Sequence, residues 1–470
     1  MGDTDALFGL VLAAGRGTRM RSRTPKLLHA VCGRPILLHA LRTVQEVGPV
    51  RTAVVVGDDE PQMRAALKGL SVEIVRQEKP LGTGHAVLQA RSLLTSHEGP
   101  VLVLNGDHPL YRAGTIARVV ERFVESRADL VLLTGEFPDT PPYGRIVRGP
   151  DGSIDRIVEE RDADQAVREI REVNLGLYVA RGPFLVRTLE QVGNQNAKGE
   201  YFLTDIVEIA LRGGHRVETV SVEDWTEALG VNDRADLAFA EATLRRRIAH
   251  DWMLRGITIT DPEHTYIDAD CEIGEDTILE PGSVLRDGSR IGSRCRISAG
   301  AVIDRSTLED DVFIKPHCFI ESSAIGPGCE VGPSAHLRPQ TVLEDNVRIG
   351  NFVEIKNSRI GPGTKADHLS YIGDADVGSG VTIGCGAITV NFDGKIKHRT
   401  VIGDRAFIGC NANLIAPLSV NADAYIAAGS TITKDVPEGA LGVARGRQRN
   451  VEQWRERWLS RTSAPDKKES

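Results

Sequence analysis

A glycine-rich basic segment near the amino terminus has the residue types that bind a polyphosphate. It runs from Leu12 through Ala13, Gly15 and Arg19 to Lys26. The glycines permit a tight turn and a close approach of a ligand to the backbone. Exposed N–H groups, basic side chains and the amino terminus of the helix expected next all favour anions. The spacing matches neither G-x-G-x-x-G nor G-K-[ST]. The segment therefore predicts a phosphate-binding loop of a different kind, between a first strand and a helix.

A carboxylate that could hold a metal ion follows a second apolar run. Asp107 ends the sequence Asn105-Gly106-Asp107, directly after the strand expected over 101–104. In open α/β sheets, ligands lie beyond the carboxyl ends of the strands. A carboxylate there is often only a helix cap, but Mg²⁺ beside a triphosphate prefers one or two protein oxygens. We therefore expect Asp107 to bind Mg²⁺.

One histidine in the second half of the chain stands where packing does not require it. His368 is the third residue of a six-residue unit, Ala366-Asp-His-Leu-Ser-Tyr371, and the first and fifth positions of such units face the core. A single histidine is more often structural than catalytic. However, an imidazole titrates near neutral pH and is suited to act as a general base.

Two different frameworks must position these groups. The first 230 residues alternate apolar strands, expected over 53–56, 101–104 and 130–134, with helical stretches. This alternation predicts a doubly wound α/β sheet. From about 267 to 436, units of six residues begin with an aliphatic residue and carry a small residue at the fifth position. Three such units per coil predict a triangular parallel β-helix, in which successive coils stack to form the core.

The small fifth position also accounts for four cysteines, which we interpret as structural: Cys271, Cys295, Cys318 and Cys329. Between the halves, apolar residues at three- and four-residue spacing predict a long helix over 233–255. We thus divide the chain into residues 1–232, a linker helix 233–256, and residues 257–470, which end in a basic tail.

Composition excludes several classes of protein. The net charge of −8 argues against general nucleic-acid binding, and no run of 18 apolar residues predicts a membrane span. Met1 to Asp5 lack the features of a signal peptide. Seven cysteines, without CxxC spacing, favour a reducing compartment. We therefore expect a cytoplasmic protein.

The segment 12–26 resembles the signature of the nucleoside-diphosphate-sugar pyrophosphorylases. Further motifs narrow this resemblance: Gln77, Leu81-Gly-Thr-Gly-His-Ala86, Tyr143-Gly-Arg-Ile146, Val158-Glu159, Asn174-Leu-Gly176 and Gly230-Val-Asn232. In this order the chain resembles the family of bifunctional N-acetylglucosamine-1-phosphate uridylyltransferases/glucosamine-1-phosphate acetyltransferases. The likeness extends from Leu10 to Arg445.

For the first half, the resemblance implies uridylyl transfer from UTP to N-acetylglucosamine 1-phosphate with release of pyrophosphate. Arg19 and Lys26 would hold the triphosphate, while Asp107 and Asn232 would bind Mg²⁺. The remaining implied contacts are to the nucleotide, by Leu12, Ala13, Gly15, Gln77, Gly82 and Thr83, and to the sugar, by Gly144, Glu159 and Asn174.

For the second half, the resemblance implies a left-handed β-helix, although parallel crossovers are usually right-handed. The implied reaction is acetyl transfer from acetyl-CoA to glucosamine 1-phosphate, with His368 as the base. The implied acceptor contacts are Arg338, Glu354, Lys356, Tyr371 and Asn391. The implied acetyl-CoA contacts are Asn391, Phe392, Lys397, Thr382, Cys410, Ala428 and Arg445. Thr382 and Cys410 depart from the family, which often has Asn and Ser there.

The resemblance also implies a homotrimer, in which the loop around Asn391 reaches a neighbouring subunit. The product, UDP-N-acetylglucosamine, would supply peptidoglycan and lipopolysaccharide synthesis. Two alternatives compete with this reading. A single-activity pyrophosphorylase for ADP-, GDP- or dTDP-sugars, with a regulatory β-helix, would lack the His368 run and the Asn391 loop. A non-enzymatic assembly subunit would be expected to lose Arg19, Lys26 or Asp107. All of these features are present.

Overall fold

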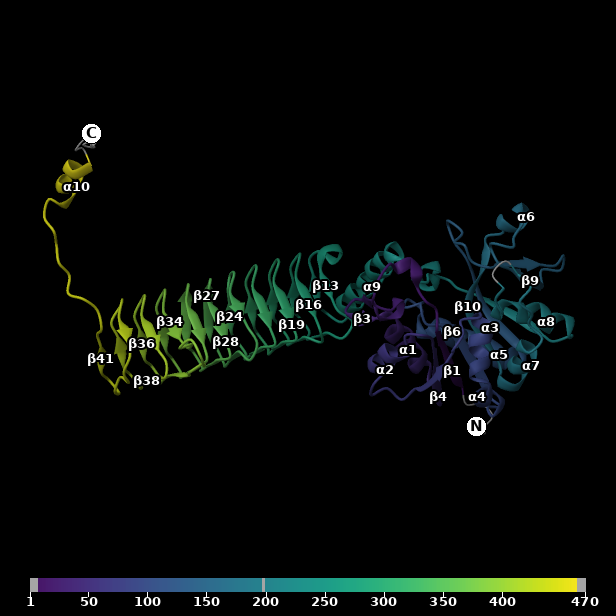
Figure 1. Cartoon of the computed structure of the whole chain (residues 1–470), viewed down its shortest axis with the longest axis horizontal. Coiled ribbons are helices and arrows are strands. Elements are labelled where there is room, and N and C mark those ends of the chain that lie inside the picture. The colour runs from purple at the N-terminus through teal and green to yellow at the C-terminus, as the bar shows by residue number, and fades with distance from the viewer. Residues whose placement is uncertain (1–6, 197–198, 463–470) are drawn as a thin grey trace, which may run out of the picture. The chain divides into compact units, whose positions relative to one another are not determined.

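The computed structural model describes residues 7–196 and 199–462 (Figure 1). The chain divides into two compact units. Unit 1 comprises the residues up to Leu254 together with Tyr266–Cys271, and unit 2 comprises Arg255–Thr265 and the residues from Glu272 onward. The amino-terminal residues, for which we predict no signal peptide, lie outside the described residues. Among the described helices, none combines the length and the apolar composition of a membrane-spanning segment.

Unit 1 is built on one mixed sheet. Its strand order is β11 (Val217–Ser221), β7 (Leu130–Glu136), β10 (Glu172–Arg181), β6 (Pro100–Asn105), β1 (Phe8–Ala13), β4 (Arg51–Val56) and β5 (Glu73–Arg76). The central strands β6, β1, β4 and β5 run parallel, whereas β10 is antiparallel to both of its neighbours. A ribbon of β8 (Arg145–Arg148) and β9 (Ile154–Val158) extends from β10. The carboxyl ends of β1 and β6, which carry the predicted loop and Asp107, are therefore adjacent.

Helices cover both faces of this sheet, as the predicted doubly wound fold requires. On β1, Val11 belongs to one apolar core and Leu10 to the other. The helices are α1 (Ile36–Val47), α2 (Glu60–Ala66), α3 (Thr83–Gln89), α4 (Arg91–Thr95), α5 (Ala113–Ser126), α6 (Gln165–Arg168), α7 (Gly182–Leu189), α8 (Ile206–Arg212) and α9 (Arg234–Leu254). Two short strands, β2 (Ala30–Val31) and β3 (Arg34–Pro35), form a hairpin before α1, and β13 (Tyr266–Ile267) also lies in unit 1. The predicted long helix over 233–255 corresponds to α9.

Unit 2 is a prism with three parallel sheets. The first face contains β12 (Thr258–Ile259), β15 (Ile278–Leu279), β18 (Arg296–Ile297), β21 (Phe313–Ile314), β24 (Glu330–Val331), β27 (Arg348–Asn351), β30 (Lys365–His368), β33 (Thr382–Ile383), β36 (Phe407–Ile408), β39 (Tyr425–Ile426) and β41 (Leu441–Gly442). The second face contains β16 (Val284–Arg286), β19 (Val302–Asp304), β22 (Phe319–Glu321), β25 (His336–Leu337), β28 (Glu354–Lys356), β31 (Tyr371–Gly373), β34 (Ile388–Val390), β37 (Asn413–Ile415) and β40 (Thr431–Ile432). The third face contains β14 (Glu272–Ile273), β17 (Arg290–Ile291), β20 (Thr307–Leu308), β23 (Ala324–Ile325), β26 (Val342–Leu343), β29 (Arg359–Ile360), β32 (Ala375–Val377), β35 (Thr400–Ile402) and β38 (Leu418–Val420). A helix, α10 (Trp454–Thr462), follows.

The interior of the prism follows the predicted six-residue pattern. The four cysteines at fifth positions are buried, which confirms their structural role. The thiols of Cys295 and Cys329 donate hydrogen bonds to the carbonyls of Glu309 (3.1 Å) and Glu344 (2.9 Å) in the next coil. Burial raises the pKa of Cys329 to about 11, which makes its thiol unreactive at neutral pH. The fold of unit 2 is the left-handed parallel β-helix that we predict.

Candidate active sites

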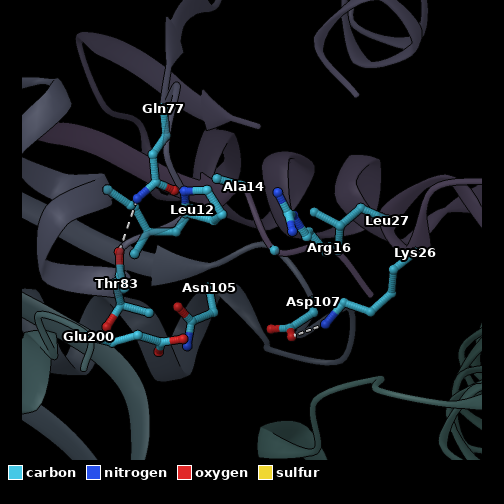
Figure 2. A pocket seen from close by; sticks show the side chains of 14 residues that line it. Leu12, Ala14, Arg16, Lys26, Leu27, Gln77, Thr83, Asn105, Asp107 and Glu200 are labelled. Carbon is cyan, nitrogen blue, oxygen red and sulfur yellow. Dashed lines mark hydrogen bonds and ion pairs between the residues drawn. The ribbon is translucent and has the colours of Figure 1, made fainter. Parts of the chain in front are cut away.

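The predicted phosphate-binding loop lines a cavity of about 460 Å³ at the carboxyl ends of β1 and β6, which we call cavity I (Figure 2). In Figure 2, Lys26 and Asp107 point toward one another at one side of the cavity, and Gln77 and Thr83 lie at the other. The lining consists of Leu12, Ala14, Gly15, Arg16, Lys26, Leu27, Gln77, Pro80, Gly82, Thr83, Ala86, Asn105, Asp107 and Glu200.

The two glycines of the loop have different roles. At Gly15, an added Cβ would have no protein atom within 4 Å, so the missing side chain leaves open space in cavity I. At Gly17, the backbone has a φ of +57°, and an added Cβ would lie 2.5 Å from the Cβ of Lys26. Gly17 thus lets Lys26 pack directly against the loop, whereas Gly15 leaves room for a ligand.

One expectation about this loop is wrong. We expect a helix directly after the loop, but Thr18–Met20 and Lys26–Leu28 each form only one turn of 3-10 helix, and α1 begins at Ile36. Gly17 and Arg21 both have left-handed backbone conformations, which interrupt a regular α-helix. At this loop the positive charge therefore comes from side chains and loop amides, and the helix amino terminus at cavity I is that of α3, which begins at Thr83.

Lys26 and Asp107 form the central ion pair of the site. The Nζ atom of Lys26 lies 2.6 Å from Oδ2 of Asp107, and both side chains are largely buried. Burial raises the pKa of the Asp107 carboxyl, but the charges of Lys26 and His108 outweigh it and leave that pKa below its ordinary value. The other oxygen, Oδ1, is buried without a hydrogen-bond partner among the described residues. Asp107 is thus ionised, with one oxygen available for a further ligand.

A second cavity of about 310 Å³, cavity II, adjoins the first. The guanidinium of Arg19 donates a hydrogen bond to Oδ1 of Asn232 (2.8 Å) at its edge. Thr204 donates to Oε1 of Glu159 at 3.0 Å. The lining consists of Arg19, Thr83, Asn105, Asp107, His108, Pro142, Tyr143, Gly144, Glu159, Asn174, Leu175, Gly176, Tyr178, Leu203, Thr204 and Asn232.

Cavities I and II have a common wall. Thr83, Asn105 and Asp107 line both. A ligand in either cavity therefore lies next to the Asp107 carboxylate, and two ligands bound together would meet there. This arrangement can bring an attacking oxygen and a charged phosphate together while cationic side chains neutralise the charge.

Most residues that the sequence predicts for the first half line one of the two cavities. Ala13 does not, because its side chain is buried in the apolar core and Ala14 lines cavity I instead. Sequence reasoning missed Asn105, Tyr143 and Thr204 as lining residues. Asn105 could have been found, since it is the last residue of β6 and precedes Gly106-Asp107.

The donor set at Asp107 suits a magnesium ion bound mainly by phosphate oxygens. Asp107 offers a carboxylate oxygen that accepts no hydrogen bond from the described residues and lies 3.5 Å from Nε2 of His108, and Asn232 offers an amide oxygen at the edge of cavity II. Within residues 7–196 and 199–462, no group of three His, Cys, Asp or Glu side chains could hold a metal ion. Mg²⁺ does not need such a cage when a triphosphate supplies oxygens.

In unit 2, His368 is exposed at the end of β30, as its third position in the repeat predicts. Its Nδ1 atom lies 3.0 Å from Oδ1 of Asn351, and the two residues are register partners in β27 and β30. An amide oxygen can only accept a hydrogen bond, so Nδ1 carries the proton and Nε2 is the basic nitrogen. Sequence reasoning missed Asn351.

The residues predicted to bind the acceptor sugar lie together on the second face. Glu354 and Tyr371 are register partners in β28 and β31, and Lys356 lies two residues beyond Glu354. Arg338 donates a hydrogen bond to Oε1 of Glu354 (2.8 Å). In the sequence, Glu354 and Tyr371 come only a few residues after Asn351 and His368, which lie at the preceding corner of the prism. The structure thus brings the predicted base and the predicted acceptor residues to neighbouring faces at one corner.

The loop after β34 divides into a buried and an exposed part. Asn391 is buried, and its amide donates to the Tyr371 hydroxyl (3.4 Å) and to the Asp374 carboxylate. Phe392 and Lys397 are exposed and form an antiparallel bridge across the loop. The Lys356 ammonium beside Lys397 lowers the pKa of Lys397. Lys397 thus adds a second basic group beside Lys356 of the predicted acceptor residues.

Four of the residues predicted to bind acetyl-CoA lie on the first face or at the ends of its strands, on the coils that come after His368 in the chain. Thr382 lies on β33, Cys410 follows β36 and Ala428 follows β39. The guanidinium of Arg445 donates to the Ala428 carbonyl at 2.9 Å. All four side chains are exposed, and they lie on the coils above the predicted base.

Comparisons with known proteins agree with the family that we predict for both halves of the chain. A family model described as a MobA-like NTP transferase domain matches residues 9–173, and one described as a GMPPB C-terminal domain matches residues 262–366. Bifunctional protein GlmU of Exiguobacterium sibiricum is 46% identical over 441 residues, covering 94% of this chain and 98% of that protein. Bifunctional protein GlmU of Geobacillus sp. is 46% identical over 450 residues, covering 96% and 98%. That of Shouchella clausii is 44% identical over 447 residues, covering 95% and 98%. The chain belongs to the bifunctional GlmU family.

Proposed function

We propose that the common wall of cavities I and II is the reaction centre of uridylyl transfer in this bifunctional enzyme of UDP-N-acetylglucosamine synthesis. UTP would occupy cavity I and N-acetylglucosamine 1-phosphate cavity II. The sugar phosphate oxygen attacks the α-phosphorus of UTP, and pyrophosphate leaves. The supporting observation is that Asp107 borders both cavities beside Lys26. The two single-purpose alternatives are not favoured, because both halves of the chain match bifunctional relatives.

In this proposal, the side chains of unit 1 align the substrates and neutralise charge. Lys26 and Arg19 offset the charge on the triphosphate and on the attacking phosphate. Gln77, whose amide donates to the Gly82 carbonyl (3.1 Å), shapes the end of cavity I for the uracil base. Leu12, Gly15, Gly82 and Thr83 complete the nucleotide site, with Ala14 in place of the predicted Ala13, and Gly144, Glu159 and Asn174 complete the sugar site.

Asp107 and Asn232 are the residues that would hold Mg²⁺. When bound there, the ion would neutralise phosphate charge. The Oδ1 atom of Asp107, which accepts no hydrogen bond from the described residues, supports this assignment.

For the second unit, we propose that His368 accepts a proton from the amine of glucosamine 1-phosphate through Nε2. This transfer accompanies attack of the amine on the thioester carbonyl of acetyl-CoA; the carbon–sulfur bond then breaks, and CoA leaves as the thiol with the proton that Nε2 received. Arg338, Glu354, Lys356, Tyr371 and Asn391 would hold the acceptor. Thr382, Phe392, Lys397, Cys410, Ala428 and Arg445 would hold acetyl-CoA together with Asn391.

We further propose that the active protein is a cytoplasmic homotrimer. Exposed apolar residues support an association of subunits through unit 2: Phe352 and Leu369 at the corner of His368, and Phe392 and Ile396 in the loop. Exposed apolar surface of this kind favours a protein partner. Sedimentation of the full chain would measure the state of association.

Two variants test whether each unit carries one of the two reactions. Asp107→Asn should lower pyrophosphate release by about 10²- to 10³-fold, since it removes the carboxylate that positions Lys26 and that would hold Mg²⁺. CoA release should stay unchanged. The matched control is Asp129→Asn, a half-exposed carboxylate beside His215, which should alter neither reaction. Unchanged pyrophosphate release by Asp107→Asn would contradict the assignment of the reaction centre.

The converse variant is His368→Ala. It should lower CoA release by about 10²- to 10⁴-fold through loss of the general base, while pyrophosphate release from UTP and N-acetylglucosamine 1-phosphate continues. His317→Ala is the matched control: it removes a histidine from an earlier coil of the same prism and should leave CoA release unchanged. A His368→Ala enzyme that acetylates at the normal rate would remove His368 from the mechanism.

A further inference from the structure

Third-position residues of successive coils form a column at the corner where the strands of the first face of unit 2 end. Strand β30 is in register with β33, and β33 is in register with β36. His368, Cys385 and Cys410 each lie two residues beyond the last core residue of these register pairs. They therefore follow one another on adjacent coils, with Ala428 on the coil above.

Backbone hydrogen bonds maintain this register beyond the ends of the strands. The Gly386 amide donates to the Leu369 carbonyl at 2.7 Å, and the Asn411 amide donates to the Cys385 carbonyl at 2.7 Å. Cys385 and Cys410 are thus neighbours across a continuous ladder, although 25 positions separate them in the sequence.

The register of the two coils sets the expected spacing of the Cys385 and Cys410 backbones. Adjacent parallel strands lie about 4.8 Å apart. A disulfide spans Cα atoms that are about 4.4 to 6.8 Å apart. Cys385 and Cys410 occupy equivalent positions in the turns after β33 and β36, and the next residues, Gly386 and Asn411, share a left-handed backbone, so the two turns direct these side chains alike. The backbone therefore needs no large movement for a bond between the two sulfur atoms.

Cys385 and Cys410 differ from the cysteines at fifth positions. Cys385 is half-buried and Cys410 is exposed, whereas Cys271, Cys295 and Cys329 are buried. Among the described residues, the sulfur atoms of Cys385 and Cys410 have no hydrogen-bond partner, unlike those of Cys295 and Cys329. Solvent-accessible thiols can react with small molecules, and buried ones do not.

We propose that Cys385 and Cys410 form a reversible dithiol–disulfide site that controls acetyl transfer. The oxidant class is a low-molecular-weight disulfide. The thiolate of one cysteine attacks this disulfide and releases one small thiol. The thiolate of the other cysteine then attacks the mixed disulfide, releases the second small thiol and forms the Cys385–Cys410 bond. The two cysteine protons end on the released thiols, so the protein is oxidised and the small disulfide is reduced.

The position of the Cys385–Cys410 disulfide would determine its effect on acetyl transfer. It would lie directly above His368 and would include Cys410, and to this extent the inference rests on the proposed acetyl-transfer site. The bridged sulfur atoms would occupy the surface along which the thioester approaches the base. Unit 1 carries its own cavities, so uridylyl transfer would continue in the oxidised enzyme.

The test uses the full chain and oxidised glutathione. After oxidation, alkylation and proteolysis, mass spectrometry should find the peptides of Cys385 and Cys410 linked, with no glutathione on either. CoA release should fall by about 10²-fold, since displacement by about 1 Å at a reacting centre has this effect. Pyrophosphate release should not change, and dithiothreitol should restore CoA release.

Two variants sharpen the test. Cys385→Ala should retain basal CoA release, form no cross-link and carry glutathione on Cys410. It should also become insensitive to phenylarsine oxide, which requires two adjacent thiols, whereas the native enzyme is inhibited. Cys329→Ala, which removes a buried thiol, should still form the cross-link.

Glutathione adducts on the native enzyme in place of the cross-link would overturn the proposal, and so would a cross-linked enzyme with full CoA release. Failure of the proposed acetyl-transfer site has a different signature. In that case His368→Ala would be active in the reduced state, while the mass spectrum would still report whether the two thiols are joined.

Discussion

Replacement of Gly17 by alanine should disable uridylyl transfer without filling either cavity. Gly17 has a φ of +57°, and an added Cβ would lie 2.5 Å from the Cβ of Lys26. Carbon atoms pack best at about 3.5 to 4.0 Å. The lysine must therefore retreat by about 1 Å. Its ammonium, now 2.6 Å from the Asp107 carboxylate, would lose this contact.

Two separate effects should follow. The left-handed backbone costs an alanine about 1 to 2 kcal/mol of stability. A displacement of about 1 Å in a group that aligns the substrate costs about 10²-fold in rate. We therefore expect kcat/KM for pyrophosphate release to fall by about 10²-fold, with a modest decrease in the melting temperature. CoA release should not change.

Gly69→Ala is the matched control, because it introduces the same backbone strain without a steric collision of the new Cβ atom. Gly69 has a φ of +89°, yet an added Cβ there has no neighbour within 4 Å. This variant should lose similar stability and retain full pyrophosphate release. The reasoning would be refuted if Gly17→Ala kept the native rate, or if Gly69→Ala lost as much activity.

Three further predictions concern other parts of the chain. Gly350→Ala should abolish CoA release and lower the melting temperature, because its Cβ would collide with the backbone carbonyl of Asp367 next to His368; a normal melting curve would contradict this. Asn351→Ala should shift the neutral His368 ring from the Nδ1–H tautomer to a mixture, visible in its ¹⁵N chemical shifts, and lower CoA release, while Asn351→Asp should keep the tautomer. Burial, together with Glu159, Glu208 and Asp162, raises the pKa of Asp205 from 3.8 to about 6. The folded protein therefore holds a proton that the unfolded chain releases between those values, and stability falls as pH rises through this window. Asp205→Asn should have a higher melting temperature than the native protein at pH 7 but not at pH 3.5, and equal curves at both values would contradict this.

The sequence predicts those parts of the fold that depend on local pattern. The expected strand over 101–104 is the centre of β6 (Pro100–Asn105), and the expected helix over 233–255 is α9. The apolar run of β6 is continuous, and in α9 the residues Leu237, Leu244 and Ile248 at helical spacing pack against the apolar core. The short turns after β1 were not foreseen, because Arg21 adopts a left-handed conformation that its residue type does not favour.

Contacts between distant segments were harder to predict. Thr204 and Glu159 meet in cavity II only because the ribbon β8–β9 is placed beside the segment before α8. The contact between Asn351 and His368 depends on coil register, which is shared by residues 17 positions apart. Cys385 was missed for the same reason, since its relation to Cys410 spans the longer loop after β34. Counting third positions through the repeat could have revealed this column.

The wall shared by cavities I and II also has a consequence for the design of inhibitors. Two fragments, one shaped for each cavity, could be joined across Thr83, Asn105 and Asp107 by a short uncharged spacer. The joined molecule would lose translational and rotational freedom only once. Its second fragment would bind at the high effective concentration that a short tether provides. Because neither cavity needs a large ligand, weak fragments found separately could become one tight inhibitor.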